Sequence, residues 1–438
     1  MPDSKNAINS ATDSQSTDAD IVVVGAGIVG VACALALSRE EQRVLVLDEE
    51  ESGMGASWGN AGHMATEQVF PIADASILTH LPRMLMDPMG PLRLDWRYLP
   101  QALPWFSRLL WNLRPKPYWA SVAGIRALNE RSLGAWQHLL ASLDRSELLK
   151  ADGSFLVYEK PESQDLITAL CSRMSHQGVD AEAWHGEAIR ERAPKLSERI
   201  LGGLFFPRTG HVVDPGNVVN TLIAAAKHHG AIFVREHLAT AETTAQGVKL
   251  VTHSGKRIDT RKVLLAAGAH SAPLARQLTG VKVPLDTERG YHLMLPKEQE
   301  RLPVAVTSFE RRFIMTPMAE GLRLAGTVEF AGLQRPARMQ RAWQLHRLSQ
   351  GLFKTDLDVS DATPWMGFRP SLPDSLPIID SVNDGKVLLA FGHHHLGLTQ
   401  AAITADIISH LTNHGERSKK NTSHSLPDLM PYRLNRFS

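Results

Sequence analysis

Three glycines near the N-terminus have a spacing that can hold a dinucleotide. Gly25, Gly27 and Gly30 form a GxGxxG pattern directly after the apolar run at 21–24. The first glycine permits a tight strand-to-helix turn, the second lets the backbone approach a pyrophosphate, and the third lets helix and strand pack closely. The N-terminus of the helix then faces the phosphates. Asp48 follows Gly30 by 18 positions, where it can accept hydrogen bonds from a ribose.

This pattern requires a β-α-β unit, and the flanking residues predict one. Apolar residues 44–47 indicate a second parallel strand, with Asp48 at its carboxyl end. A further group of elements ends in the small-residue turn 266–268. We therefore predict that the first 70 residues and residues 200–280 share one sheet, as in a two-dinucleotide-fold domain interrupted by an insertion. The elements predicted in the later group are a helix at 216–229 and strands at 232–234, 248–252, 257–259 and 262–265.

A second sheet is predicted within residues 283–330, where strand-length apolar runs alternate with turn residues. Helical periodicity follows at 337–353, and the apolar strand 387–391 then runs into Gly392 and a helix at 399–410. This helix N-terminus is another place for an anion or the edge of a cofactor. The predicted fold class is α/β, with a discontinuous dinucleotide domain and an α+β domain built on an antiparallel sheet. The strands predicted in the second sheet are 291–295, 304–307, 312–317 and 322–329.

Composition narrows the function. The 438 residues include 47 basic and 46 acidic ones, so nothing indicates nucleic acid as a partner, and a small substrate is expected. Cys33 and Cys171 are too few for a disulfide framework and fit a reducing, cytoplasmic compartment. Glycines break the apolar stretch 21–37, which argues against a membrane span. Residues 1–19 show no secretory signal and are predicted to be a disordered leader, and residues 413–438 a loosely held tail.

Residues 76–150 have a helical pattern that is rich in large apolar side chains. Two interpretations remain open at this point. The first is that these side chains pack between buried helices. The second is that they form a cap over an active site or a surface that touches a membrane or a partner. The side chains concerned are Trp96, Trp105, Phe106, Leu109, Leu110, Trp111 and Trp119.

Five motifs, in a fixed order along the chain, carry a resemblance to a known family. Over roughly residues 20–412 the chain resembles the D-amino-acid-oxidase superfamily of flavoproteins. It is most similar to bacterial D-amino-acid dehydrogenases, including those acting on D-proline-type substrates, and less similar to glycine and sarcosine oxidases. A purely NAD-dependent enzyme would explain the first motif alone. The motifs are the glycine pattern with Asp48, GASWGNAGH at 55–63, AAGAHS at 266–271, GFRP at 367–370 with Pro373 and Asp374, and GHHHLG at 392–397.

The resemblance implies a Rossmann-like FAD domain and a second domain for the substrate. It places the FAD domain at 20–95, 198–282 and 366–412, and the substrate or cap domain at 96–197 and 283–365. FAD would be the cofactor and would carry the redox chemistry, while the protein orients the substrate.

The resemblance also implies which residues contact FAD. The loop at 56–63 would pass the pyrophosphate, the turn at 266–268 would approach the adenosine and ribityl portion, and Ala239 would lie near the adenine. Relatives with covalent FAD attach it through a histidine aligned with Gly59 or a cysteine close to Phe368; this chain has neither, so dissociable FAD is implied. The complete set is Gly25, Ala26, Gly27, Ile28, Val29, Gly30, Asp48, Glu49, Ala56, Ser57, Asn60, Ala61, Gly62, His63, Ala239, Ala266, Ala267, Gly268, Gly392, His394, His395, Leu396, Gly397, Leu398 and Thr399.

Four residues are candidates for the substrate site. Arg369 matches the family arginine that pairs with the substrate carboxylate, and a planar guanidinium offers two parallel donors for that purpose. Tyr291 falls in the sheet that covers the flavin, either as a pocket residue or in packing, and His63 would be the loop side chain nearest the substrate. His395 stands where glycine oxidase has a second arginine, which implies a weaker, pH-dependent partner. The run of histidines 393–395 lacks nearby ligands at a suitable spacing, so no metal site is predicted.

The resemblance implies FAD-dependent oxidation of a small amino or imino acid, with a D-amino acid, including the D-proline or hydroxy-D-proline type, as the leading hypothesis. Hydride transfer from Cα to flavin N5 would give an imino acid and then a 2-oxo acid, with a quinone or oxygen as electron acceptor. Two alternatives stay open: oxidation of glycine, sarcosine or an L-imino acid, and a flavin-binding subunit of a larger complex. Peripheral contact with the cytoplasmic face of a membrane and a homo-oligomer are further expectations.

Overall fold

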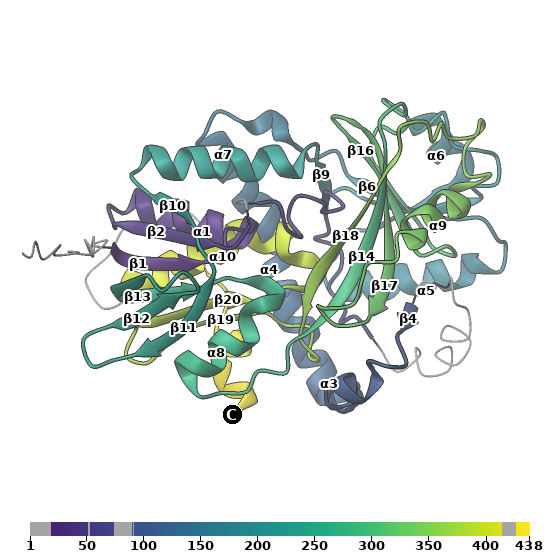
Figure 1. The fold of residues 1–438 in the computed structure, drawn as a ribbon. Coiled ribbons are helices and arrows are strands. Elements are labelled where there is room, and N and C mark those ends of the chain that lie inside the picture. The colour runs from purple at the N-terminus through teal and green to yellow at the C-terminus, as the bar shows by residue number, and fades with distance from the viewer. Residues whose placement is uncertain (1–18, 51–52, 74–89, 91, 414–425) are drawn as a thin grey trace, which may run out of the picture.

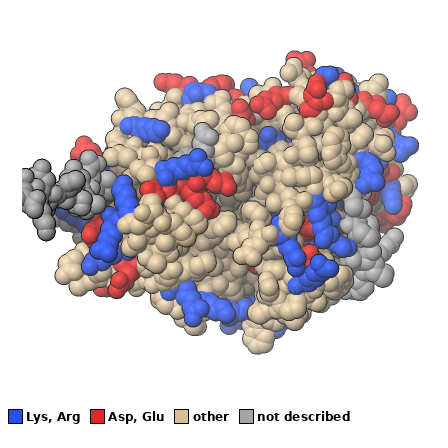
Figure 2. Space-filling model, viewed as in Figure 1, with Lys and Arg blue, Asp and Glu red and all other residues tan. Residues whose placement is uncertain are grey.

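The computed structural model describes residues 19–50, 53–73, 90, 92–413 and 426–438. This part of the chain contains two large sheets, and Figure 1 shows them next to each other with helices around them. Residues 1–18 of the predicted leader lie outside the described residues, and Ala19 already belongs to the first strand. Figure 2 shows acidic and basic side chains on the same face, in keeping with the balanced composition.

Within the described residues, the first sheet has eight strands. They are β1 (Ala19–Val24), β2 (Val44–Asp48), β10 (Ile232–Arg235), β11 (Leu238–Thr243), β12 (Val248–Thr252), β13 (Arg257–Leu265), β19 (Ile378–Val382) and β20 (Val387–Phe391). Their order is β10-β2-β1-β13-β12-β11, and β20 joins β13 while β19 joins β20. The pairs β1–β2, β1–β13, β2–β10 and β13–β20 are parallel, so the carboxyl ends of these strands meet at one edge.

β1 is central because both of its faces are apolar. Ile21 and Val23 pack into the cluster that contains residues of α1, α4, α7 and α10, whereas Val22 and Val24 pack with β11, β12 and α8. Burial on both faces is typical of a parallel strand covered on two sides. These helices are α1 (Ile28–Arg39), α4 (Pro115–Ala141), α7 (Pro215–His228), α8 (Ser271–Thr279) and α10 (Gly397–Asn413).

The predicted α/β class is confirmed, and the first 70 residues do share a sheet with residues from 200–280. One detail is wrong. The strands predicted at 257–259 and 262–265 are a single strand, β13, whose first half pairs with β12 and whose second half pairs with β1. Its polar residues alternate with buried ones, so they face solvent instead of breaking the strand.

The second sheet has nine strands among the described residues, in the order β18-β14-β17-β16-β15-β6-β8-β7 with β4 beside β17. Most of its pairs are antiparallel, and only β15–β6 and β17–β4 are parallel. The strands are β4 (Leu92–Leu94), β6 (Ser154–Tyr158), β7 (Glu182–His185), β8 (Gly202–Phe206), β14 (Asp286–Leu295), β15 (Ala305–Ser308), β16 (Phe313–Met318), β17 (Gly321–Phe330) and β18 (Thr363–Ser371).

The membership of this sheet departs from the predicted division into domains. β4, β8 and most of β18 fall inside ranges predicted for the FAD domain, yet all three strands pair with strands of the second sheet. β18 forms nine residue pairs with β14, so long-range pairing places it there although the strands that follow it, β19 and β20, belong to the first sheet. This placement matters because β18 carries Arg369.

The remaining elements connect the two sheets. A small third sheet joins β3 (His63–Met64), β9 (Gly210–Val212) and β5 (Leu149–Lys150), which ties the end of the 55–63 loop to the insertion. Of the aromatic-rich segment, residues 76–89 and 91 lie outside the described residues. In the rest, Trp105 is buried, as packing between helices requires, whereas Trp111 is exposed, and contact with a membrane or a partner stays a prediction. The other helices are α3 (Leu99–Asn112), α5 (Ser163–His176), α6 (Gly186–Arg192) and α9 (Gln340–Ser349).

The prediction of a loosely held tail is wrong for residues 426–438. Tyr432 is fully buried, and its hydroxyl donates to the carbonyl oxygen of Gly124 in α4 at 2.7 Å. Arg436 forms an ion pair with Asp374 at 2.7 Å. The polar composition of the tail hid these few long-range contacts, which hold it against the first sheet and α4.

Candidate cofactor and substrate site

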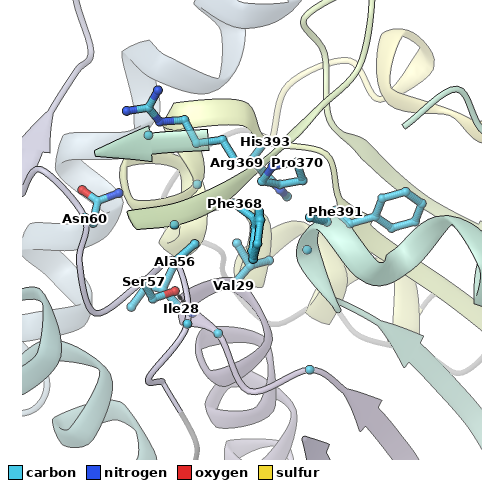
Figure 3. Close-up of a pocket in the computed structure, with 18 of the residues that line it drawn as sticks. Ile28, Val29, Ala56, Ser57, Asn60, Phe368, Arg369, Pro370, Phe391 and His393 are labelled. Atoms are coloured by element: carbon cyan, nitrogen blue, oxygen red, sulfur yellow. Dashed lines mark hydrogen bonds between the residues drawn. The ribbon is translucent and has the colours of Figure 1, made fainter. Parts of the chain in front are cut away.

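One cavity of about 740 Å³ lies between the two sheets. It extends from the carboxyl ends of β1 and β2 to the second sheet (Figure 3), where Ile28 and Ser57 lie on one side and Arg369 on the other. All four predicted substrate-site residues line it, together with most of the predicted FAD contacts. The predicted FAD residues that do not line it are Ala26, Gly30, Gly62, Leu396 and Thr399.

The glycine turn leaves no room for side chains. Gly25 has a φ of 105°, and a Cβ there would lie 2.5 Å from the carbonyl oxygen of Ala266. A Cβ at Gly30 would lie 2.0 Å from the carbonyl oxygen of Gly25, so this glycine acts through packing and not by direct contact with a ligand. Asp48 accepts a hydrogen bond from the backbone N–H of Ala26 at 2.5 Å and therefore fixes the turn as well as lining the cavity. Helix α1 begins at the cavity, so its N-terminus suits a pyrophosphate.

The 55–63 loop is held in place from both sides. Ser57 Oγ accepts from the backbone N–H of Ile28 at 2.8 Å, which ties the loop to the first turn of α1. On the other side Arg323 of β17 donates to the carbonyl oxygen of Asn60 at 2.5 Å, and His292 of β14 bonds the carbonyl oxygen of Gly59 at 2.8 Å. Burial lowers the pKa of His292 to about 3, so its ring is neutral and Nδ1 carries the proton that it donates.

These contacts test the fit of a dinucleotide cofactor. The glycine backbone, the α1 N-terminus and Asp48 form one continuous wall of the cavity with the turn at 266–268. Such a set of backbone donors and one carboxylate suits a pyrophosphate and a ribose. The residues present therefore fit FAD at this wall.

Arg369 places a cation in the wall of the cavity. Its guanidinium lies over Gly290 of β14, where a Cβ would be 2.3 Å from Nη2, and Nη1 donates to the carbonyl oxygen of Thr327 at 3.4 Å. Among the described residues no carboxylate forms an ion pair with it, although burial lowers its pKa and the charge of Glu288 acts in the opposite direction. Since arginine stays protonated, the cavity holds a fixed positive charge that an anionic ligand can neutralise.

A buried chain of hydrogen bonds lies behind Arg369. Ser371 Oγ donates to Glu288, and it also bonds Nδ1 of His394 at 2.8 Å. The backbone N–H of Leu372 donates to His394 Nε2 at 3.1 Å, so Nδ1 is the ring nitrogen that faces Ser371 with a proton. Burial alone would raise the pKa of Glu288, but its bonds with His394 and Ser371 and the charge of Arg369 lower it to about 2. Glu288 is therefore ionised and steadies Arg369 electrostatically.

His395 lies beside Arg369 but is not a second cation. Its Nε2 donates a hydrogen bond to Oε1 of Gln68 at 2.6 Å. Burial, followed by the charge of Arg369, lowers the pKa of His395 to about 3. The ring is therefore neutral at physiological pH in this structure, and a pH-dependent role for it beside a substrate carboxylate stays a prediction.

The pKa of His63 is shifted in the opposite direction. Its Nδ1 faces the carbonyl oxygen of Gly210 at 3.1 Å, and its Nε2 faces Oε1 of Glu67 at 2.9 Å. Burial alone would lower the pKa of His63, but the charge and hydrogen bond of Glu67 and the Gly210 carbonyl raise it above 6.5. Both ring nitrogens therefore have acceptors, as an imidazolium requires.

Tyr291 does not point toward Arg369. Its hydroxyl donates to Glu329 at 2.5 Å and accepts from the backbone N–H of Arg338 at 3.2 Å. Adjacent residues of a strand face opposite sides of the sheet, so Tyr291 lies on the face opposite the one where Arg369 covers Gly290. Tyr291 is among the residues that line the cavity, but its hydroxyl belongs to a buried polar network with Glu329 and Arg338.

The three consecutive histidines have three separate environments. His393 Nε2 lies 3.1 Å from Oγ1 of Thr404 in α10, whereas His394 and His395 bond Ser371 and Gln68. No group of three or more His, Cys, Asp or Glu side chains in the described part of the chain is arranged to hold a metal ion.

Sequence reasoning missed several residues that shape the site. His292 and Arg323 hold the cofactor loop from the second sheet, and no local signal marks them. Glu67 could have been found, because it stands four positions after His63. Gln68 and Glu288 became visible only through the contacts that the fold creates.

Comparison with protein families agrees with this geometry. The model of the FAD dependent oxidoreductase (DAO) family matches residues 20–411. This chain belongs to that family. It is an FAD-dependent oxidoreductase, as the five motifs predicted.

Curated relatives are similar over almost the whole chain. A D-amino-acid oxidase of Bradyrhizobium diazoefficiens is 32% identical over 400 residues, which cover 89% of this chain and 94% of the relative. A D-amino acid dehydrogenase of Dechloromonas aromatica is 28% identical over 397 residues, covering 88% of this chain and 94% of the relative.

Solved structures show the same fold at lower identity. Glycine oxidase from Geobacillus kaustophilus aligns with a TM-score of 0.73 and 19% identity, covering 96% of this chain and 99% of that one. L-proline dehydrogenase from P. horikoshii aligns with a TM-score of 0.68 and 17% identity, covering 96% and 98%. No helix in the described ranges is long and apolar enough to span a bilayer.

Proposed function

We propose that the protein oxidises a small D-amino acid, with cyclic D-imino acids of the D-proline type included in its substrate class. The observation that carries this proposal is the position of Arg369. Its guanidinium forms no ion pair with a carboxylate in the described part of the chain, and it lines the same cavity as the glycine turn and Asp48. A planar guanidinium can bind a carboxylate through two parallel hydrogen bonds. The curated relatives described above are named D-amino-acid oxidase and D-amino acid dehydrogenase.

The chain's own residues bind and orient this substrate. Arg369 fixes the carboxylate, and its position is maintained by Thr327 and by the ionised Glu288. His395 is neutral, so the site presents one cation to one carboxylate. FAD held at the wall formed by the glycine turn and Asp48 would supply the acceptor for a hydride from Cα. No carboxylate or imidazole of the chain has to remove a proton from Cα, provided that the substrate amine is neutral.

The cofactor is proposed to be dissociable. Cys33 is fully buried in the first sheet's core, and neither it nor Cys171 lines the cavity, so no thiol is placed to attach a flavin. Gly59 also lacks the side chain that some relatives use. Acid precipitation should therefore release the yellow colour into the supernatant.

A second candidate is oxidation of glycine, sarcosine or an L-imino acid. Two structural relatives are named glycine oxidase and L-proline dehydrogenase, and at 19% and 17% identity they show the shared fold alone. The electron acceptor is proposed to be a quinone or oxygen, since curated relatives are named both dehydrogenases and an oxidase.

The test is anaerobic reduction of the bound flavin by a panel of D- and L-amino acids, proline and hydroxyproline isomers, glycine and sarcosine. Bleaching by D-forms supports the proposal, and bleaching by L-forms or glycine derivatives alone favours the second candidate. If flavin is present and no compound bleaches it, a flavin-binding role within a larger complex becomes the better account.

A variant tests the carboxylate site itself. Arg369→Ala should keep its flavin and lose on the order of 100-fold in kcat/KM, because charge-assisted hydrogen bonds to the substrate are lost. Arg436→Ala is the matched control, since it removes an arginine that pairs with Asp374 outside the cavity. Unchanged affinity in Arg369→Ala would contradict the assignment.

A further inference from the structure

Large apolar side chains gather on the outer face of α3. Five of the fourteen large apolar side chains that are exposed among the described residues lie between Trp96 and Trp119. Within α3, Leu103, Leu110 and Trp111 are 54%, 52% and 62% exposed. They are spaced seven and eight residues apart, so they lie on one face of the helix. Exposed apolar side chains also stand on both sides of α3 in the sequence.

These two ends each add an exposed tryptophan. Trp96 precedes α3 and is 57% exposed, and Trp119 lies in the second turn of α4 and is 50% exposed. The guanidinium carbon of Arg114, between the two helices, lies 3.1 Å from the centre of the Trp111 ring. A cation stacked on an exposed indole is an amphipathic pair, apolar on one side and charged on the other.

The opposite face of α3 is firmly packed. Ala102 is fully buried, Trp105 is 4% exposed, and Trp105 Nε1 donates to the carbonyl oxygen of Ser371 at 3.0 Å. Trp105 also packs against Phe330 of β17, with ring centres 5.2 Å apart. The helix is therefore fixed by its own core, and its outer apolar face is not needed for that packing. Figure 1 shows α3 at the lower edge of the molecule, outside both sheets.

The segment that carries this face has charged residues of one sign in its sequence. From residue 96 to residue 129 the sequence contains no aspartate or glutamate, although the whole chain is balanced at 47 basic and 46 acidic residues. Arg97, Arg108, Arg114 and Lys116 fall in this stretch, and all four are exposed. Basic side chains around exposed tryptophan and leucine match the interface of a bilayer that contains anionic lipids.

We propose that this face, made by Trp96, Leu103, Leu110, Trp111 and Trp119, docks the protein onto an anionic membrane surface. The indoles and leucines enter the headgroup region, while the four basic side chains contact lipid phosphates. The inference goes beyond the proposed function, because it does not depend on the substrate. It also links the membrane to the site, since Trp105 bonds Ser371, which lies two residues after Arg369 in β18.

The experiment is co-sedimentation of the full chain with phosphatidylcholine vesicles and with vesicles containing phosphatidylglycerol. The wild type should bind the anionic vesicles, and binding should weaken with added salt, because screening reduces the attraction of lipid phosphates. The triple variant Trp96→Ser/Leu110→Ser/Trp111→Ser should reduce the partition coefficient by roughly tenfold or more, because buried apolar area is lost. The double variant Arg108→Glu/Lys116→Glu should abolish the preference for anionic vesicles.

The matched control is Leu166→Ser/Leu201→Ser/Trp343→Ser, which removes three exposed apolar side chains outside this face. It should bind vesicles like the wild type. Flavin content and reduction by substrate in solution should stay unchanged in all variants, which shows that they fold. Equal sedimentation of the wild type and the triple variant would overturn the proposal. So would a dimer in solution that only the triple variant dissociates, because the face would then cover a second copy of the chain.

Discussion

A substitution at Gly290 should reduce activity as strongly as one at Arg369, because the guanidinium of Arg369 occupies the space where a side chain of residue 290 would lie. A Cβ at Gly290 would lie 2.3 Å from Nη2 of Arg369, whereas ordinary contacts begin at 3.4 Å. Gly290→Ala must therefore move the guanidinium by about 1 Å, and misplacement of this size costs on the order of 100-fold in rate. We expect KM for the amino acid to rise and kcat/KM to fall by that order, while the flavin stays bound.

The assay is steady-state kinetics with the best substrate of the reduction panel and an artificial electron acceptor, together with the flavin-to-protein ratio. Gly134→Ala in α4 is the control, because a Cβ there meets no atom within 4 Å. If Gly290→Ala retains kcat/KM within twofold of the wild type, the position of Arg369 does not determine catalysis. If it loses flavin instead, the residue supports the cofactor and not the carboxylate.

Three further predictions concern stability. The pKa of His63 is raised in the folded state, so protonated His63 contributes its full stabilisation below pH 6.5 and loses it as pH rises through the folded-state pKa. Tm should therefore fall above pH 6.5, and Glu67→Gln should make that fall smaller in a thermal-shift series. His393 has a pKa lowered to about 3 by burial and then by His394, so its neutral form stabilises the fold above pH 6.5, and Tm should fall as pH drops from 6.5 toward 3; His393→Gln should reduce that slope in a thermal-shift series. Tyr432→Phe should lower the free energy of unfolding by about 1 kcal/mol in a urea titration, because the hydrogen bond to α4 is lost, and an unchanged midpoint would argue against an anchored tail.

The stacked arrangement at the cofactor loop explains why the second sheet matters for FAD. His292 stacks on Trp365 with ring centres 4.9 Å apart, and the same histidine holds the carbonyl oxygen of Gly59. A Cβ at Gly59 would lie 2.3 Å from the Trp365 ring, so the loop and the sheet fit closely only with glycine there. The second sheet thus holds the 55–63 loop in the conformation that lines the cavity.

The dinucleotide half of the site could be predicted from the sequence because its information is local. The spacing of Gly25, Gly27 and Gly30 specifies a turn whose backbone geometry admits no side chain, and the apolar run before it specifies a strand. Asp48 follows because the second strand of such a unit has a set length. The GFRP motif likewise indicated Arg369 through its resemblance to a family pattern.

Only the tertiary structure decided the substrate half. The sequence shows that Arg369 exists, but its lack of an ion-pair partner in the described part of the chain depends on which carboxylates the fold brings near it. His63 and His395 are the same residue type, yet their pKa values shift in opposite directions, because Glu67 faces one ring, whereas the other lies beside Arg369 and bonds a neutral amide. Ionisation depends on burial and on charges supplied by distant segments, and these are properties of the packed chain that residue spacing alone does not determine.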